Sequence, residues 1–320
     1  MNRKKKIIIS FAGGLGNQLF QYSMAQQLTN KYKVCLEFDL GLAVKDARGN
    51  PEILNFEIDK NFEIIRAKSV NKYSIRLMST FRKISSTNKK FKKHSVKMLL
   101  ELPARLLMWI EFSYPLKVQT GSGTGYFNPK KLFMRNSYLV GYFQSYRWSE
   151  DKSDLESLRR IKLKDYSTEI SRYQSLSELE DPLVVHIRLG DYIDNPKFGI
   201  PSEKYYLRGL EKLWESQKYK KIWIFTNDQS SAEKIFPSEF LEYARWIPEV
   251  EGSASKTLEV MRFGKGYLIG NSTFSWWGAR LSYAKNPAVI VPNPWFAHAD
   301  VPIDLIPSDW EELSAGYPYA

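Results

Sequence analysis

Short apolar runs alternate with helical stretches in this chain, and the alternation starts twice. Near the N-terminus, KKKIIISF predicts a strand, GGLG a turn and NQLFQYSMAQQLTNKY a helix, before a second strand in VCLEFDL. The pattern starts again at PLVVHIRLGDY and ends with the strand AVIVPNPWF. Such alternation is typical of parallel α/β sheets. We therefore expect two Rossmann-like α/β domains, at residues 1–155 and 156–320, that face each other across a cleft.

The middle of the first half is strongly basic. Residues 60–112 read as helical, and between Lys60 and Lys97 there are twelve Lys or Arg and a single acid, Glu63, in a chain of net charge +12. Two interpretations stay open: peripheral contact with anionic membrane lipid, or a solvated helical face. A nucleic-acid protein would spread its charge over a groove and carry a known binding motif, so we expect no nucleic-acid partner.

The sequence offers few metal ligands and no membrane anchor. It has one cysteine, three histidines and no Asp-x-Asp, so neither a zinc site nor a carboxylate pair for a metal–diphosphate is predicted. No apolar run approaches the length of a transmembrane helix, and the run after the basic N-terminus is too short for a signal peptide. We expect a cytoplasmic protein that uses no metal.

GGLGNQ lies where the first strand should pass into the first helix. Backbone N–H groups and the helix dipole favour anions at such a position. Asn17 would act as a hydrogen-bond donor there, and Gly14 and Gly16 would let a substrate approach closely. The motif lacks the spacing of a dinucleotide fingerprint or a P-loop. A tight turn without a binding role is the alternative.

HIRLGDY follows two valines of an expected buried strand. Polar residues at the carboxyl end of a parallel strand lie where α/β proteins bind ligands. Arg188 can donate two hydrogen bonds to a phosphate. His186 could hydrogen-bond a base, a ribose or a phosphate, and Asp191 would either orient Arg188 or accept a proton. The alternative is a structural Arg–Asp pair that closes a turn.

Two further strands are followed by polar residues. FTND places Asn227 after one strand, with a solvated turn as the alternative. GNSTFSWWGARL follows another and would begin a helix whose backbone donors face a diphosphate. Its candidate residues are Asn271, Ser272, Thr273, Phe274 and Arg280. A surface arginine is the alternative for Arg280.

GGLGNQLFQY, GYFQSYRW, HIRLGDY and NSTFSWWGA with VPNPWF occur in this order between residues 11 and 296. Together they resemble the bacterial α-1,2-fucosyltransferases of glycosyltransferase family 11. The resemblance implies a GT-B-like fold and metal-free, inverting transfer of L-fucose from GDP-β-L-fucose to the 2-hydroxyl of a terminal galactoside. In a bacterium the acceptor would belong to a surface polysaccharide or to lipopolysaccharide O-antigen, in free or lipid-linked form.

The resemblance also implies roles for individual residues. The motif of His186 and Arg188 would bind GDP, with Arg188 on the diphosphate, so that the second domain holds the donor and the first the acceptor. Asn17 matches an essential asparagine of the related protein O-fucosyltransferases, and Arg280 an arginine after their Ser-Phe segment. Thr257 stands where the family has an acid, and Glu259 lies nearby but out of register.

The resemblance leaves other activities open. A different sugar nucleotide or linkage is one alternative, and a glycan-binding relative without transfer is another.

Overall fold

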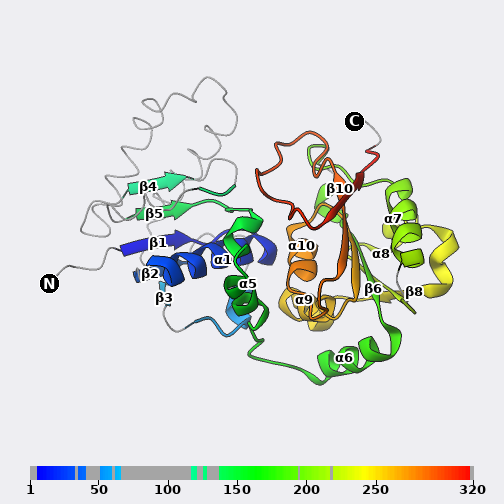
Figure 1. Cartoon of the computed structure of the whole chain (residues 1–320), viewed down its shortest axis with the longest axis horizontal. Helices are drawn as coiled ribbons and strands as arrows, with labels where there is room; N and C mark the ends of the chain where they lie inside the picture. Colours follow the sequence, from blue (N-terminus) through cyan, green and yellow to red (C-terminus); the bar gives the residue numbers. More distant parts are fainter. Residues whose placement is uncertain are drawn as a thin grey trace. The chain divides into compact units, whose positions relative to one another are not determined.

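The computed structural model describes residues 6–32, 35–40, 51–59, 62–65, 117–120, 125–127, 137–193, 195–216 and 219–317 (Figure 1). The chain divides into two compact units. The first comprises Met1–Leu54, Ile58–Asp154 and Pro302–Leu305, and the second Asn55–Glu57, Leu155–Val301 and Ile306–Ala320. Each unit contains one parallel sheet, so the expected α/β, GT-B-like fold class is confirmed. A single boundary near residue 155 does not describe two short segments. Residues 55–57 belong to the second unit, and residues 302–305 belong to the first.

The sheet of the first unit has the strand order β3-β2-β1-β5-β4. Its strands are β1 (Lys6–Ser10), β2 (Cys35–Asp39), β3 (Phe62–Ile65), β4 (Lys117–Thr120) and β5 (Ser137–Val140). Ile7, Ile8 and Ile9 of the central strand are fully buried, as a strand covered on both faces requires. Helix α1 (Leu15–Tyr32) joins β1 to β2, and the 3-10 turns η1 (Glu52–Asn55) and η4 (Tyr146–Ser149) complete the described part of the unit.

Most of the basic segment 60–112 lies outside the described residues. Residues 62–65 are an exception, because they form β3, paired in parallel with β2. The expected helix is therefore wrong at these four positions.

The sheet of the second unit has the order β11-β10-β9-β6-β7-β8, and all neighbouring strands are parallel. Its strands are β6 (Leu183–Ile187), β7 (Ile222–Thr226), β8 (Ala244–Ile247), β9 (Gly266–Ile269), β10 (Ala288–Asn293) and β11 (Glu311–Ser314). The helices of this part of the chain are α5 (Lys152–Arg159), which contains the unit boundary, α6 (Thr168–Glu180), α7 (Glu203–Ser216), α8 (Gln229–Ala232), α9 (Ala254–Met261) and α10 (Thr273–Arg280). The short 3-10 turns are η5 (Gly190–Tyr192), η6 (Ser238–Tyr243) and η7 (Val250–Gly252).

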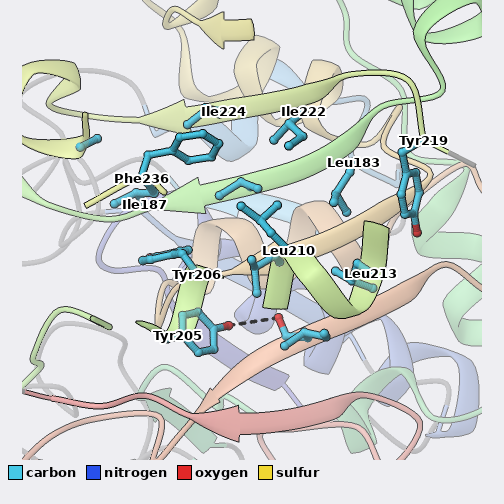
Figure 2. Packing of buried hydrophobic residues seen from close by; sticks show 14 of the residues in the cluster. Leu183, Ile187, Tyr205, Tyr206, Leu210, Leu213, Tyr219, Ile222, Ile224 and Phe236 are labelled. Carbon is cyan, nitrogen blue, oxygen red and sulfur yellow. Dashed lines mark hydrogen bonds between the residues drawn. The ribbon is translucent and has the colours of Figure 1, made fainter. Parts of the chain in front are cut away.

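One face of this sheet packs against α7 (Figure 2). Val185 and Ile187 of β6 and Ile224 of β7 contribute to this cluster. Because side chains alternate along a strand, His186 points to the opposite face. The hydroxyl of Tyr205 on α7 donates to the backbone oxygens of Ile269 (2.6 Å) and Ile290 (3.3 Å). The helix is thereby fixed to the end of β9 and the middle of β10.

Candidate functional site

The chain order of the second sheet changes direction between β6 and β9. Successive strands run from β6 to β8 on one side and from β9 to β11 on the other, which is the doubly wound order of a Rossmann sheet. In such sheets ligands bind outside the carboxyl ends of the strands at this switch point. The loops that leave β6 and β9 there are HIRLGDY and GNSTF, and Gly270 N donates to His186 O (2.9 Å) between them.

Arg188 and Asp191 form an ion pair in the loop after β6. Nη2 of Arg188 donates to Oδ1 of Asp191 at 2.6 Å, and the guanidinium carbon lies 5.6 Å from the ring centre of Tyr192. A guanidinium has five N–H donors, and within the described part of the chain only Nη2 donates. Arg188 is therefore held in direction while most of its donors stay available to an anion.

The loop holds Arg188 in place through residues that were not predicted. Burial raises the pKa of Tyr192 to about 12, so its phenol stays neutral, and its hydroxyl donates to Asn271 O (3.2 Å). Tyr192 thus connects the loop after β6 to the loop after β9. Gly190 has a φ of +61°, and a Cβ there would collide with the amide nitrogen of Asn227.

Asn227 fixes this loop from the end of β7. Its Oδ1 accepts from Leu189 N at 2.9 Å. The side chain is exposed, and its Nδ2 lies beside Gly190. Asn227 therefore holds the backbone of the loop after β6, a role that the sequence did not predict.

His186 is buried on the face of β6 opposite α7. It is 4% exposed, and burial, with a smaller effect of the Arg188 charge, lowers its pKa to about 3. The imidazole is therefore neutral near pH 7. Within the described residues its Nδ1 has no hydrogen-bond partner, and its ring lies 6.1 Å from that of Phe274. A neutral imidazole can hydrogen-bond a ligand but cannot balance the charge of a diphosphate.

The polar residues after β9 differ in the hydrogen bonds that their side chains make within the second unit. Asn271 is fully buried, and its Nδ2 donates to Phe198 O (2.8 Å), Gly199 O (3.0 Å) and the hydroxyl of Tyr317 (3.2 Å). Its amide protons therefore hold neighbouring loops together. Ser272 caps α10 by accepting from Phe274 N (3.3 Å), and Thr273 is the first residue of that helix.

Arg280 lies at the far end of α10. It is the last residue of the eight-residue helix, so about 10 Å of helix rise separates it from Thr273. The carboxyl edge of the sheet lies at the first turn. The structure brings Arg188 and the start of α10 to the same edge, and it does not bring Arg280 there.

Thr257, which stands where the resemblance leads us to expect an acid, makes structural hydrogen bonds in this chain. Thr257 Oγ1 accepts from Val250 N (2.9 Å) and donates to Ser253 O (2.8 Å), which closes the start of α9. Glu259 is buried and accepts from Arg262 Nη1 at 2.7 Å and from the hydroxyl of Tyr283. Glu259 is thus engaged inside the second unit.

In the first unit, β1 lies at the centre of the sheet, between β2 and β5. GGLGNQ follows β1. Gly14 is exposed with open space around it, whereas Gly16 is buried in the first turn of α1, which begins two residues earlier than expected. Asn17 is half-buried in the same turn, and its Oδ1 accepts from Nε2 of Gln144, in the loop after β5, at 2.7 Å. Sequence reasoning missed Gln144, although GYFQSYRW contains it.

The described residues hold no group of three or more His, Cys, Asp or Glu side chains placed to bind a metal ion. No helix among them is long and apolar enough to cross a membrane. A cavity of about 490 Å³ lies between α7 and the end of β11, lined by Ser202, Glu203, Lys204, Arg208, Ser314, Gly316 and Tyr317. None of the predicted site residues lines it.

Comparison with known proteins assigns the family. The profile described as Glycosyl transferase family 11 matches residues 6–299. Relatives from Escherichia coli include the O-antigen biosynthesis glycosyltransferase WbnK, 30% identical over 89% of this chain and 93% of its own, and an alpha-1,2-colitosyltransferase, 25% identical over 96% and 98%. The chain therefore belongs to glycosyl transferase family 11.

Some solved structures resemble the chain more distantly. NodZ alpha-1,6-fucosyltransferase soaked with GDP-fucose gives a TM-score of 0.47 at 15% identity, covering 88% of this chain and 93% of its own. E. coli ADP-heptose lps heptosyltransferase II gives a TM-score of 0.47 at 12% identity, covering 97% of this chain and 90% of its own.

Proposed function

We propose that this protein transfers L-fucose from GDP-β-L-fucose to the 2-hydroxyl of a terminal galactoside, without a metal ion, during synthesis of a bacterial surface polysaccharide such as O-antigen. Family membership supports the transfer of a sugar. The relatives named for O-antigen biosynthesis and for alpha-1,2 transfer support the acceptor class and the linkage.

The position of Arg188 carries the proposal. It is a half-exposed guanidinium, held by Asp191, at the switch point of a doubly wound sheet and beside the start of α10. A departing GDP gains negative charge on its diphosphate, and fixed donors that face such charge are typically worth about 3–4 kcal/mol each in the transition state. Arg188 and the first turn of α10 supply such donors without a metal.

The proposed reaction is a single in-line displacement. The acceptor oxygen bonds to C1 of fucose while the bond from C1 to the β-phosphate oxygen breaks, and the electron pair leaves with GDP. A β-linked donor then gives an α-linked product. The acceptor proton passes late to a phosphate oxygen or to solvent, because Asp191 Oδ1 is already engaged by Nη2 of Arg188.

Colitose is the second candidate for the transferred sugar, favoured by the relative named alpha-1,2-colitosyltransferase. Colitose is the 3-deoxy counterpart of L-fucose, so the two donors differ by one hydroxyl. A site that hydrogen-bonds a substrate hydroxyl rejects an analogue lacking it by about 10⁴-fold or more. Measurement with both donors therefore separates the candidates clearly.

The test is a transfer assay with the purified protein. GDP-β-L-fucose, GDP-colitose and GDP-mannose are each offered with a panel of terminal galactosides, with and without EDTA, and linkages are assigned by NMR. An α-1,2-fucosylated product that forms equally well with EDTA is expected. Transfer of colitose alone would establish the second candidate. Activity lost with EDTA and restored by Mg²⁺ would refute the metal-free step, and no transfer from any donor would refute the proposal.

A further inference from the structure

The loops after β1 and β5, two neighbouring parallel strands of the first sheet, are fastened together. Gln21 of α1 makes the main connection, because its Oε1 accepts from Ala12 N (3.1 Å) and its Nε2 donates to Gly141 O (2.7 Å). Gln18 adds a bond from its Nε2 to Gly13 O (2.8 Å). Both loops therefore have a fixed backbone around Asn17.

The side chain of Asn17 is fixed separately, by Gln144. Nε2 of Gln144 donates to Oδ1 of Asn17 at 2.7 Å, and Gln144 is only 7% exposed. Since the oxygen of the Asn17 amide accepts this bond, its NH₂ group must face the other way. Within the described residues this NH₂ group donates to no other atom.

Gly13 makes room for the NH₂ group. Its φ is +76°, and a Cβ there would lie 2.7 Å from Asn17 Nδ2 and 3.1 Å from a ring carbon of Tyr142. A side chain at residue 13 would press against the Asn17 amide. Gly13 thus leaves room for the NH₂ group, while Gln144 holds the oxygen of the same amide.

We propose that Gln144 is a positioning residue that sets the direction of the Asn17 amide, so that Asn17 presents its NH₂ group to a substrate oxygen. This inference rests on the proposed transferase function, in which Asn17 contacts substrate. Gln144 acts through Asn17 only. An amide that turns by half a rotation keeps almost the same shape but exchanges the places of its acceptor oxygen and its NH₂ donors. Gln144 holds one of these two orientations.

Three variants test the orientation. Gln144→Ala releases the amide, and we expect kcat to fall about tenfold with a smaller change in KM, as loss of orientation predicts. Gln144→Glu offers only acceptor oxygens, so the Asn17 amide turns its NH₂ inward and its oxygen toward the substrate; the loss should exceed that of Gln144→Ala. Gln27→Ala is the matched control, because Gln27 is also a buried glutamine, and its Nε2 donates to Arg147 O (3.0 Å).

A double-mutant cycle with Asn17→Ala then isolates the connection. If Gln144 acts through Asn17, adding Gln144→Ala to Asn17→Ala changes kcat less than twofold. Additive losses, or a loss in Gln27→Ala equal to that in Gln144→Ala, would overturn the proposal.

An NMR measurement separates this inference from the proposed function. The side-chain amide signals of Asn17, assigned with Asn17→Ala, should shift in Gln144→Ala and stay in place in Gln27→Ala, whether or not the protein transfers fucose. Unmoved Asn17 signals in Gln144→Ala overturn the inference alone. A wild-type protein with no transferase activity but with the expected shift overturns the proposed function and leaves the positioning intact.

Discussion

Arg188 and Asp191 lie three residues apart, and a 2.6 Å hydrogen bond joins Nη2 of the arginine to Oδ1 of the aspartate. The side chains are 32% and 62% exposed. Exposed pairs of this kind contribute little to stability, about 0–1 kcal/mol. Orientation of the guanidinium is thus the main effect of the pair, and it is a property that activity measurements can detect.

Arg188→Ala should reduce kcat/KM for transfer by about 10²–10³-fold, because it removes the cation proposed to stabilise the departing diphosphate. Arg188→Lys should recover little of this loss, since an ammonium lacks the planar fork. Arg172→Ala is the matched control: this exposed arginine on α6 also pairs with an acid three residues away, Glu169. Near-normal turnover in Arg188→Ala would rule out its assigned role.

Asp191→Asn should lower activity no more than about tenfold and should leave the shape of the pH–rate profile unchanged. The amide oxygen can still accept from Arg188, while the proton-accepting ability is gone. A general base typically contributes about 10²–10⁴-fold, so a loss of that size, together with loss of the acidic limb of the profile, would make Asp191 the base. Steady-state kinetics from pH 5 to pH 9 decide between the two.

Gly190→Ala should destabilise the loop after β6. The positive φ alone costs about 1–2 kcal/mol, and the collision of the new Cβ with the Asn227 amide adds to it. Gly252→Ala is the control, because Gly252 has a similar φ of +64° and open space around it. Urea unfolding should show the larger loss for Gly190→Ala. Equal losses of unfolding free energy would mean that the Asn227 side chain moves away from the new Cβ at no cost.

His186 should make the second unit acid-sensitive. Its pKa is about 3 in the folded protein and about 6.5 when unfolded, so below pH 6.5 the unfolded state binds a proton that the native state does not. Above pH 6.5, protonation of His186 does not lower the free energy of unfolding. Below pH 6.5 this free energy falls by about 1.4 kcal/mol per pH unit as the pH drops toward 3. Urea unfolding at pH 7.5 and 5.0 should show a smaller acid loss for His186→Asn. Parallel losses would refute the assigned burial.

The sequence predicted which strand ends come together better than it predicted the contacts that their polar residues make. Apolar runs that end in polar residues predicted β6, β7 and β9, and the rule for parallel sheets then placed their polar ends at one edge. Polar residues at strand ends can bind ligands or hold loops, however, and the amino-acid sequence does not distinguish these two roles. Asn227 and Asn271 were predicted as ligand contacts, yet both use side-chain atoms to hold neighbouring loops.

Two of the strands that were missed lack an apolar signal. β4 (KVQT) and β11 (EELS) are short and polar, and each pairs with a single neighbour in the described sheets. Edge strands with charged residues are common, because the charge discourages pairing with other molecules. Gln144 was missed for a different reason: its partner Asn17 is 127 residues away in sequence, so only the pairing of β1 with β5 brings the two together.

Glu259→Gln should cost about 3–5 kcal/mol of unfolding free energy, because it leaves the buried guanidinium of Arg262 without its counter-charge. Arg262 is fully buried, and besides Glu259 it donates to the backbone oxygens of Leu281 (3.0 Å), Ile161 (3.4 Å) and Arg159. It therefore ties the chain between α5 and α6 to the C-terminal ends of α9 and α10.

The control for this variant is Glu169→Gln, which breaks the exposed pair with Arg172 and should cost less than about 0.5 kcal/mol. Tryptophan fluorescence during urea unfolding measures both. Replacing the pair together, as Glu259→Gln with Arg262→Met, should recover part of the loss, because no uncompensated charge stays buried. A Glu259→Gln protein as stable as Glu169→Gln would show that water or a shifted side chain neutralises Arg262, and that this pair does not hold the chain between α5 and α6 in place.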